Sequence, residues 1–215
     1  MEQTSLYRAL PRAATTLVAL GFLASASPAL STAFVDQGSS TLDTNTGLEW
    51  LDVTLTDDKS VDDFLSGYGG YLAAGYHVAT WSEVDMLVQD AGFPGLGPYN
   101  PQAIYYPAAS TLVSLLGPTY GDGGNQSGIQ GLAYYGGSYR DPQVGWINES
   151  GTLKGYTTDC CGFYGSSAHF ANVGLYLVRA VPEPATWMMM LLGFAAIAMT
   201  IRAAPRRVPE IMQIA

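Results

Sequence analysis

The sequence predicts an α+β fold, with a mainly antiparallel sheet and two or three short helices packed on it. Three observations lead to this class: a turn between two alternating segments near residue 45, a capped helix at residue 80, and later Gly-, Tyr- and Ser-rich segments typical of strands. This order, a little β, then helices, then mostly β, favours helices gathered on one side of an antiparallel sheet. No internal repeat is visible.

The first element expected is a β-hairpin whose turn runs from Asp43 to Gly47. Asn and Gly in that stretch tolerate positive φ, and the flanking residues alternate apolar and polar side chains. Apolar residues of the second strand should pack inward: Leu48, Trp50 or Leu51.

Helices are expected at residues 60–66, 80–92 and 110–116. Ser60 is a suitable N-cap, and the two aspartates after it suit the first turn of a helix. Thr80 and Glu83 have the spacing of a capping box, and Gly92 is a helix stop. Five strands complete the pattern: residues 76–79, 129–135, 144–148, 153–158 and 175–180.

Charge is distributed unevenly along the chain. Residues 34–181 hold 15 Asp and Glu against 4 Lys and Arg, a net charge of −11. Nucleic-acid binding needs clustered cations that neutralise phosphates, so we expect no nucleic-acid partner. The acidity suits solubility, or a neutral or cationic partner.

The N-terminal residues 1–33 are predicted to be a secretory signal peptide. Arg8 and Arg12 precede an apolar run at residues 13–24, and small residues follow at positions that signal peptidase reads. The alternative is an uncleaved anchor helix, although this run is short for a bilayer. Both readings place a globular domain, residues 34–180, outside the cytoplasm.

The C-terminus has a three-part pattern. Pro182, Glu183 and Pro184 favour an extended entry and are followed by Trp187 and an uncharged stretch. The pattern predicts a transmembrane helix at residues 187–201, with Trp187 at the headgroup level and arginines on the cytoplasmic side. The arginines that act as a membrane stop are Arg202, Arg206 and Arg207.

Residues 181–207 resemble the PEP-CTERM sorting signal of exported Gram-negative bacterial proteins. The resemblance implies a transient inner-membrane anchor, recognition of Pro-Glu-Pro by the membrane protease exosortase, and transfer to the cell surface or extracellular matrix. Two features depart from it: the apolar stretch spans only roughly 22 Å as a helix, and a tail of residues 208–215 follows the arginines. The alternative is an ordinary C-terminal anchor without processing.

The central domain has a second resemblance, carried by TGLEWLD, GYHVATWSEVDML and GLYLVRAV in that order. These blocks resemble exported C-type lectin-like domains of the Lcl or DUF1566 type, which implies a lectin-like fold. The EPN, QPD and WND triplets of calcium-dependent sugar sites do not occur in this domain. The resemblance therefore extends to the fold and not to that site.

No cofactor and no metal site are expected. An acidic cluster, Asp57, Asp58, Asp62 and Asp63, lacks the spacing of a calcium loop and suits a solvated helix start. Residues 121–128 form another flexible loop with oxygen-bearing side chains. Zinc would require Cys160, Cys161 and His169 together, and adjacent cysteines rarely close one tetrahedron. The cysteine pair instead suggests a vicinal disulfide, a link to another chain, or two buried thiols.

No catalytic motif is present, so no catalytic residue is assigned and the domain is expected not to be an enzyme. Nine tyrosines fall between residues 99 and 164, where they suit either strand packing or stacking on sugar rings. The residues expected to stack on a ligand are Tyr134, Tyr135, Tyr139 and Trp146. These features predict a surface or biofilm-matrix protein that binds exopolysaccharide. The alternative is a secreted hydrolase acting on such a polysaccharide.

Overall fold

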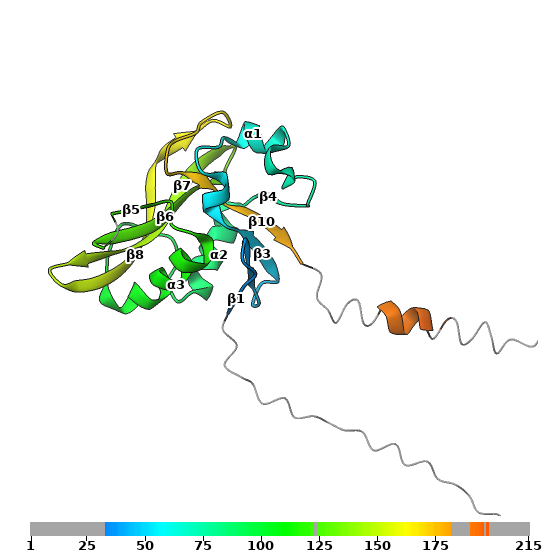
Figure 1. Ribbon diagram of the computed structural model, residues 1–215, viewed down its shortest axis with the longest axis horizontal. Helices are drawn as coiled ribbons and strands as arrows, with labels where there is room; N and C mark the ends of the chain where they lie inside the picture. Colours follow the sequence, from blue (N-terminus) through cyan, green and yellow to red (C-terminus); the bar gives the residue numbers. More distant parts are fainter. Residues whose placement is uncertain (1–32, 123, 182–189, 196, 198–215) are drawn as a thin grey trace, which may run out of the picture. The chain divides into compact units, whose positions relative to one another are not determined.

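The computed structural model describes residues 33–122, 124–181, 190–195 and 197, except the side chains of residues 160 and 161 (Figure 1). By contacts the chain divides into residues 1–31 and residues 32–215, and the described residues all belong to the second unit. Several predicted features therefore lie outside the described residues: nearly all of the signal peptide, Pro182, Glu183, Pro184, Trp187, the arginines 202, 206 and 207, and the tail.

Residues 190–195 and 197 are helical. They belong to the predicted transmembrane helix, residues 187–201, whose other residues lie outside the described part of the chain. Within the described part of the chain, no helix has the length and apolarity to cross a membrane.

One sheet contains five antiparallel strands in the order β1-β2-β3-β10-β4. Their bounds are β1 Phe34–Asp36, β2 Ser40–Asp43, β3 Leu48–Leu51, β4 His77–Val78 and β10 Leu177–Ala180. The predicted hairpin is confirmed as β2 and β3, which pair from Ser40↔Leu51 to Asp43↔Leu48. Trp50 and Leu51 are both buried because β3 lies inside the sheet and is covered on both faces.

The other sheet is an antiparallel meander. Its strands are β5 Tyr120–Gly121, β6 Gln126–Tyr135, β7 Ser138–Glu149 and β8 Thr152–Tyr164. The last three run well beyond the predicted strands. Pro142 lies inside β7, next to a register shift between Tyr139 and Asp141. A proline without an N–H is tolerated at such an irregularity, which is why a strand predicted to begin at residue 144 starts at residue 138.

The end of the domain joins both sheets. The single predicted strand at 175–180 is two strands: β9 Gly174–Leu175 pairs in parallel with β6, and β10 pairs with β3 and β4. Tyr176 lies between them, donating to Leu132 O and accepting from Ala79 N–H. The chain thus changes sheets at one buried residue.

Three α-helices confirm the prediction: α1 Val61–Leu65, α2 Trp81–Asp90 and α3 Tyr106–Leu116. Short 3₁₀ helices occur at η1 Val53–Thr56, η2 Tyr68–Gly70 and η3 Ala103–Tyr105. Ser60 and Thr80 each form a complete capping box, so both predicted helix starts are confirmed. Helix α3 begins four residues earlier than expected, because Pro107 fits the first helical turn.

The main core lies between the meander and helices α2 and α3. Figure 1 shows both helices beside this sheet, and α3 also contacts β2 of the other sheet. Buried side chains from β3, α2, α3, β6 and β7 form one cluster, including Trp50, Val84, Leu87, Leu112, Leu116, Ile129, Ala133 and Val144. A second cluster on the other side of β6 contains Leu51, Val61, Phe64, Leu132 and Leu175. This arrangement fixes the N-terminus of α2 against the β6–β7 hairpin, where Tyr134 N–H donates to Ala79 O.

Candidate functional site

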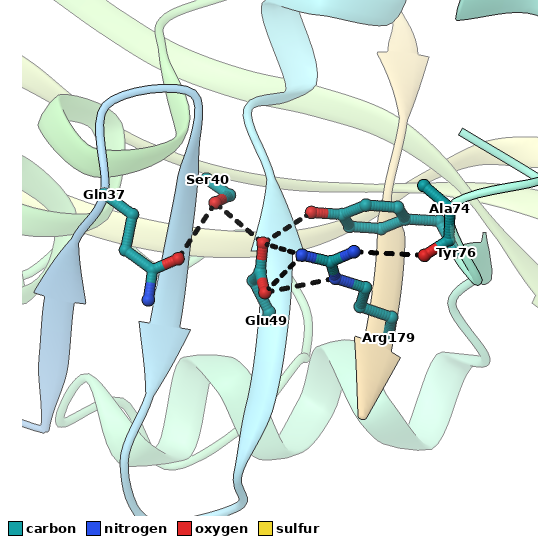
Figure 2. A network of polar contacts seen from close by, with 6 residues as sticks. All are labelled: Gln37, Ser40, Glu49, Ala74, Tyr76 and Arg179. Carbon is teal, nitrogen blue, oxygen red and sulfur yellow. Dashed lines mark hydrogen bonds and ion pairs between the residues drawn. The ribbon is translucent and has the colours of Figure 1, made fainter. Parts of the chain in front are cut away.

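A buried carboxylate links the first hairpin to the last strand (Figure 2). Glu49 is 5% exposed and accepts hydrogen bonds from both Nε and Nη2 of Arg179, at 2.9–3.1 Å. The Tyr76 hydroxyl and the Ser40 hydroxyl donate to Glu49 Oε1 at 2.7 and 2.9 Å. Arg179 also lies over the Tyr76 ring and donates to Ala74 O at 3.0 Å.

Burial alone would raise the pKa of Glu49, but the hydrogen bonds from Tyr76, Arg179 and Ser40 outweigh it and hold the pKa below its ordinary value. Burial and the neighbouring carboxylate raise the pKa of Tyr76 to about 12. The polar atoms of these side chains hydrogen-bond to one another, so the network stabilises the fold. All three sequence blocks behind the lectin-like resemblance contribute to it, through Glu49, Tyr76 and Arg179. The residues that these three blocks contribute, Glu49, Tyr76 and Arg179, therefore have a structural role.

A different group of side chains lines a surface groove of about 450 Å³. Its walls come from the start of α2, the loop after α2, the β6–β7 hairpin and β8. The lining residues are Trp81, Leu96, Gly97, Pro98, Tyr135, Arg140 and Asp159. Alternation along the strands explains the gathering: Arg140 pairs with Ala133, two residues before Tyr135, so both side chains lie on the same face.

Arg140 lies at the centre of an aromatic cluster. Its guanidinium carbon is 5.0–5.3 Å from the ring centres of Trp81, Tyr135 and Phe163. Tyr135 contacts both other rings, with centroids 5.6 Å from Trp81 and 6.1 Å from Phe163. Cations over aromatic faces are attracted by the ring quadrupole. Arg140 Nη2 also lies 2.6 Å from Asp159 Oδ1, so a cation and an anion lie together in the groove.

The groove combines wet and apolar surfaces. Tyr135, which lines the groove, is 42% exposed, and Phe163, which contacts Tyr135, is 66% exposed. The side chains of Arg140 and Asp159 retain 19% and 29% exposure, whereas Arg140 Nε is covered and has no hydrogen-bond partner within the described residues. Such a surface can stack on an apolar face and exchange hydrogen bonds beside it.

The loop after α2 is held rigidly against the groove. Asp85 Oδ1 accepts from Leu96 N–H at 2.6 Å, and Thr157 Oγ1 donates to Gly95 O at 2.9 Å. The Asp159 N–H donates to Gly97 O at 3.0 Å, which ties the loop to β8. These bonds fix the groove wall before any ligand arrives.

The four residues predicted to stack on a ligand do not form one platform. Tyr134 packs on its cross-strand partner Tyr139, with centroids 5.8 Å apart. Tyr135 follows it directly and therefore points to the opposite face, into the groove. Trp146 is far from Tyr135, because Tyr135 pairs with Ser138 and Trp146 lies eight residues further along β7. Its ring packs on Tyr106 of α3. Only Tyr135 of the four lines the groove.

Trp81, Arg140 and Asp159 were missed by sequence reasoning, and Phe163 was not among the four residues expected to stack on a ligand. Trp81 lies in the helix expected at residues 80–92, and the other three are brought together by the pairing of β7 with β8. One signal was available: Arg140 is among only four basic residues in positions 34–181 and lies next to Tyr139 and close to Tyr134 and Tyr135.

The acidic candidates are arranged as helix and loop supports. Asp62 and Asp63 occupy the first turn of α1, and Asp63 completes the capping box of Ser60. Asp58 contacts His169 at 3.0 Å. Asp122 Oδ1 accepts three backbone N–H groups of its own loop, which lower its pKa. Within the described residues, no group of three or more His, Cys, Asp or Glu is placed to hold a metal ion.

The backbone of Cys160 and Cys161 belongs to β8, and their side chains lie outside the described part.

Comparison with protein families gives one match, the PEP-CTERM protein-sorting motif, at residues 180–207. No curated protein and no solved structure matched the chain. The match begins at Ala180, the last residue of β10. The chain therefore carries a PEP-CTERM sorting motif, which implies an exported protein that is processed by exosortase and sorted to the cell surface.

Proposed function

We propose that residues 34–180 form a non-enzymatic surface module that binds extracellular polysaccharide in the groove around Arg140. The observation that carries the proposal is the set of exposed rings beside a charged pair, Tyr135 and Phe163 beside Arg140 and Asp159. Sorting to the cell surface would place this groove among the cell's own exopolysaccharides. In this proposal signal peptidase and the inner membrane are encountered only on the way out.

The rings would supply most of the affinity. Burying roughly 60 Å² of one ring face against a sugar, at about 25 cal/mol per Å², is worth about 1.5 kcal/mol, or about tenfold in affinity. The Arg140–Asp159 pair would orient the sugar, because a guanidinium donates hydrogen bonds and a carboxylate accepts them. A preformed groove of this kind loses little conformational freedom on binding.

The alternative of a polysaccharide hydrolase requires two carboxyl groups facing each other across the sugar. Among the described residues, Asp159 is the one carboxylate that lines the groove. Asp141 directly follows Arg140 in the sequence, but its side chain lies on the opposite face of the sheet. It is 3% exposed there and accepts a hydrogen bond from Gln130. These placements favour binding over hydrolysis.

The test compares two adjacent tyrosines. The full chain, kept soluble in a detergent without a sugar headgroup, is titrated with a panel of polysaccharides by calorimetry. Tyr135→Ala should weaken the best ligand about tenfold, whereas Tyr134→Ala, equally exposed at 43% on the opposite face, should change it less than about twofold. Equal losses in both variants, or heat from no polysaccharide, would remove the groove as the binding site.

A further inference from the structure

We infer that the groove selects a neutral polysaccharide over an acidic one, with the Arg140–Asp159 pair reading its hydroxyl groups. This inference rests on the proposed binding function and names its ligand class. It follows from the charges in and around the groove and from the chemistry that a paired guanidinium and carboxylate present.

The charge of Arg140 is already offset inside the groove. Asp159 Oδ1 lies 2.6 Å from Arg140 Nη2, and in the described part of the chain no other residue that lines the groove is charged. A uronate or sulfate group would have to displace Asp159 or approach it, and bringing like charges together is unfavourable. The groove thus offers an acidic sugar no net attraction.

The surrounding domain adds repulsion. Residues 34–181 carry 15 acidic against 4 basic side chains. Of the three other basic residues in this stretch, Lys154 is paired with Glu149, Arg179 with Glu49, and Lys59 lies over the Tyr68 ring. A polyanion would meet a negative field without a compensating patch.

A hydroxyl suits the pair better than an anion does. It accepts from a guanidinium N–H and donates to a carboxylate oxygen at the same time, so it can join the ion pair without breaking it. The rings of Tyr135 and Phe163 favour a sugar with an apolar C–H face, which is found where the hydroxyls are equatorial. The ligand class is therefore a neutral hexose polymer of this type.

The experiment uses polymers that share a backbone and differ in charge: hydroxyethyl cellulose against carboxymethyl cellulose, and dextran against carboxymethyl dextran. The full chain in the same detergent is analysed by affinity electrophoresis. At least one neutral polymer should bind at least about tenfold more tightly than its carboxymethyl form. Raising sodium chloride from about 0.05 M to about 0.5 M should change neutral binding less than about twofold, because no net charge is neutralised.

Asp159→Asn supplies the matched variant, because it leaves Arg140 uncompensated with little change in shape. It should weaken neutral binding and strengthen binding of the carboxymethyl form, and the new binding should fall with salt. Tighter wild-type binding to a carboxymethyl polymer, lost at high salt, would overturn the neutral class while leaving polysaccharide binding intact. Binding to none of the four polymers, with Tyr135→Ala also without effect, would overturn both the ligand class and the proposed function.

Discussion

At the scale of single residues, Glu49 shows how the fold uses a charge that does not face a ligand. Its carboxylate is almost fully enclosed, and five hydrogen bonds from Arg179, Tyr76 and Ser40 replace its water. Removing one partner of a buried pair costs far more than the pair itself contributes, because the other charge is stranded.

We expect Glu49→Gln to lower the free energy of unfolding by about 2 kcal/mol, less than a fully buried pair would lose, because Arg179 is 35% exposed. Urea denaturation followed by circular dichroism measures the change. Glu149→Gln breaks the exposed pair with Lys154 and should cost less than about 1 kcal/mol. Similar losses in the two variants would show that the network adds no more than a surface ion pair.

At the scale of elements, the loop after α2 determines the shape of the groove. Gly95 adopts a φ of +129°, and an added Cβ would lie 2.8 Å from Asp85 Oδ1. Asp85 is the residue whose carboxylate holds Leu96 N–H, so a clash there moves the groove wall. Gly124, which does not line the groove, has no atom within 4 Å of an added Cβ and no positive φ.

Gly95→Ala should therefore weaken polysaccharide binding about tenfold, with a small loss of thermal stability. Gly124→Ala should leave the affinity within about twofold of wild type and the melting temperature unchanged. Calorimetric titration and thermal melts on the same preparations provide the two readouts. Retained affinity in Gly95→Ala would mean that this wall does not contact the ligand.

Strand β10 is the element on which the domain boundary depends. It lies between β3 and β4, Leu177 and Val178 are fully buried, and Val181 N–H still donates to Gly47 O. A chain that ends at residue 181 should fold cooperatively, and one that ends at residue 176 should not. Circular dichroism of both truncations checks this. If the chain that ends at residue 176 also folds, β10 is dispensable for folding, and proteolytic cleavage within β10 would leave the domain intact.

The sequence was informative where structure is local. The capping boxes at Ser60 and Thr80, and the hairpin turn beginning at Asp43, depend on near neighbours and were predicted correctly. The extension of β7 through Pro142 was missed, because a proline is tolerated inside this strand only where the register of β7 and β8 shifts. The groove was missed because it depends on tertiary structure: the pairing of β7 with β8 and the placement of the start of α2 beside β6 bring Arg140, Asp159 and Trp81 together.

At the scale of the whole molecule, acidity controls stability. Burial raises the pKa of Asp43, Asp52, Asp57 and Asp141 above the ordinary value of 3.8. The folded state therefore binds protons more tightly than the unfolded state in the pH range just above 3.8, and stability decreases as pH rises through that range. Self-repulsion among excess carboxylates acts in the same direction.

We predict a higher melting temperature at about pH 5 than at about pH 7.5. At still lower pH the melting temperature should decrease again. The pKa of Glu49 is lowered in the folded state, so its pairing with Arg179 is lost as pH falls through this lowered pKa. Asp141→Asn should reduce the difference between the two pH values, since it removes one of the raised groups. A melting temperature that rises steadily from pH 5 to 7.5 would be the opposite result.

Under the proposed function, sorting by exosortase would place the preformed groove at the cell surface, where it would hold a matrix polymer. Hydrogen–deuterium exchange of the full chain, with and without its best neutral polysaccharide, locates the ligand on the molecule. We expect slower exchange in the loop at residues 94–98 and in the β6–β7 hairpin around residues 135–140, which border the groove. Protection confined instead to residues 118–128, beside the separate cavity at Trp146, would place the ligand elsewhere and refute the role of Arg140 and its aromatic neighbours.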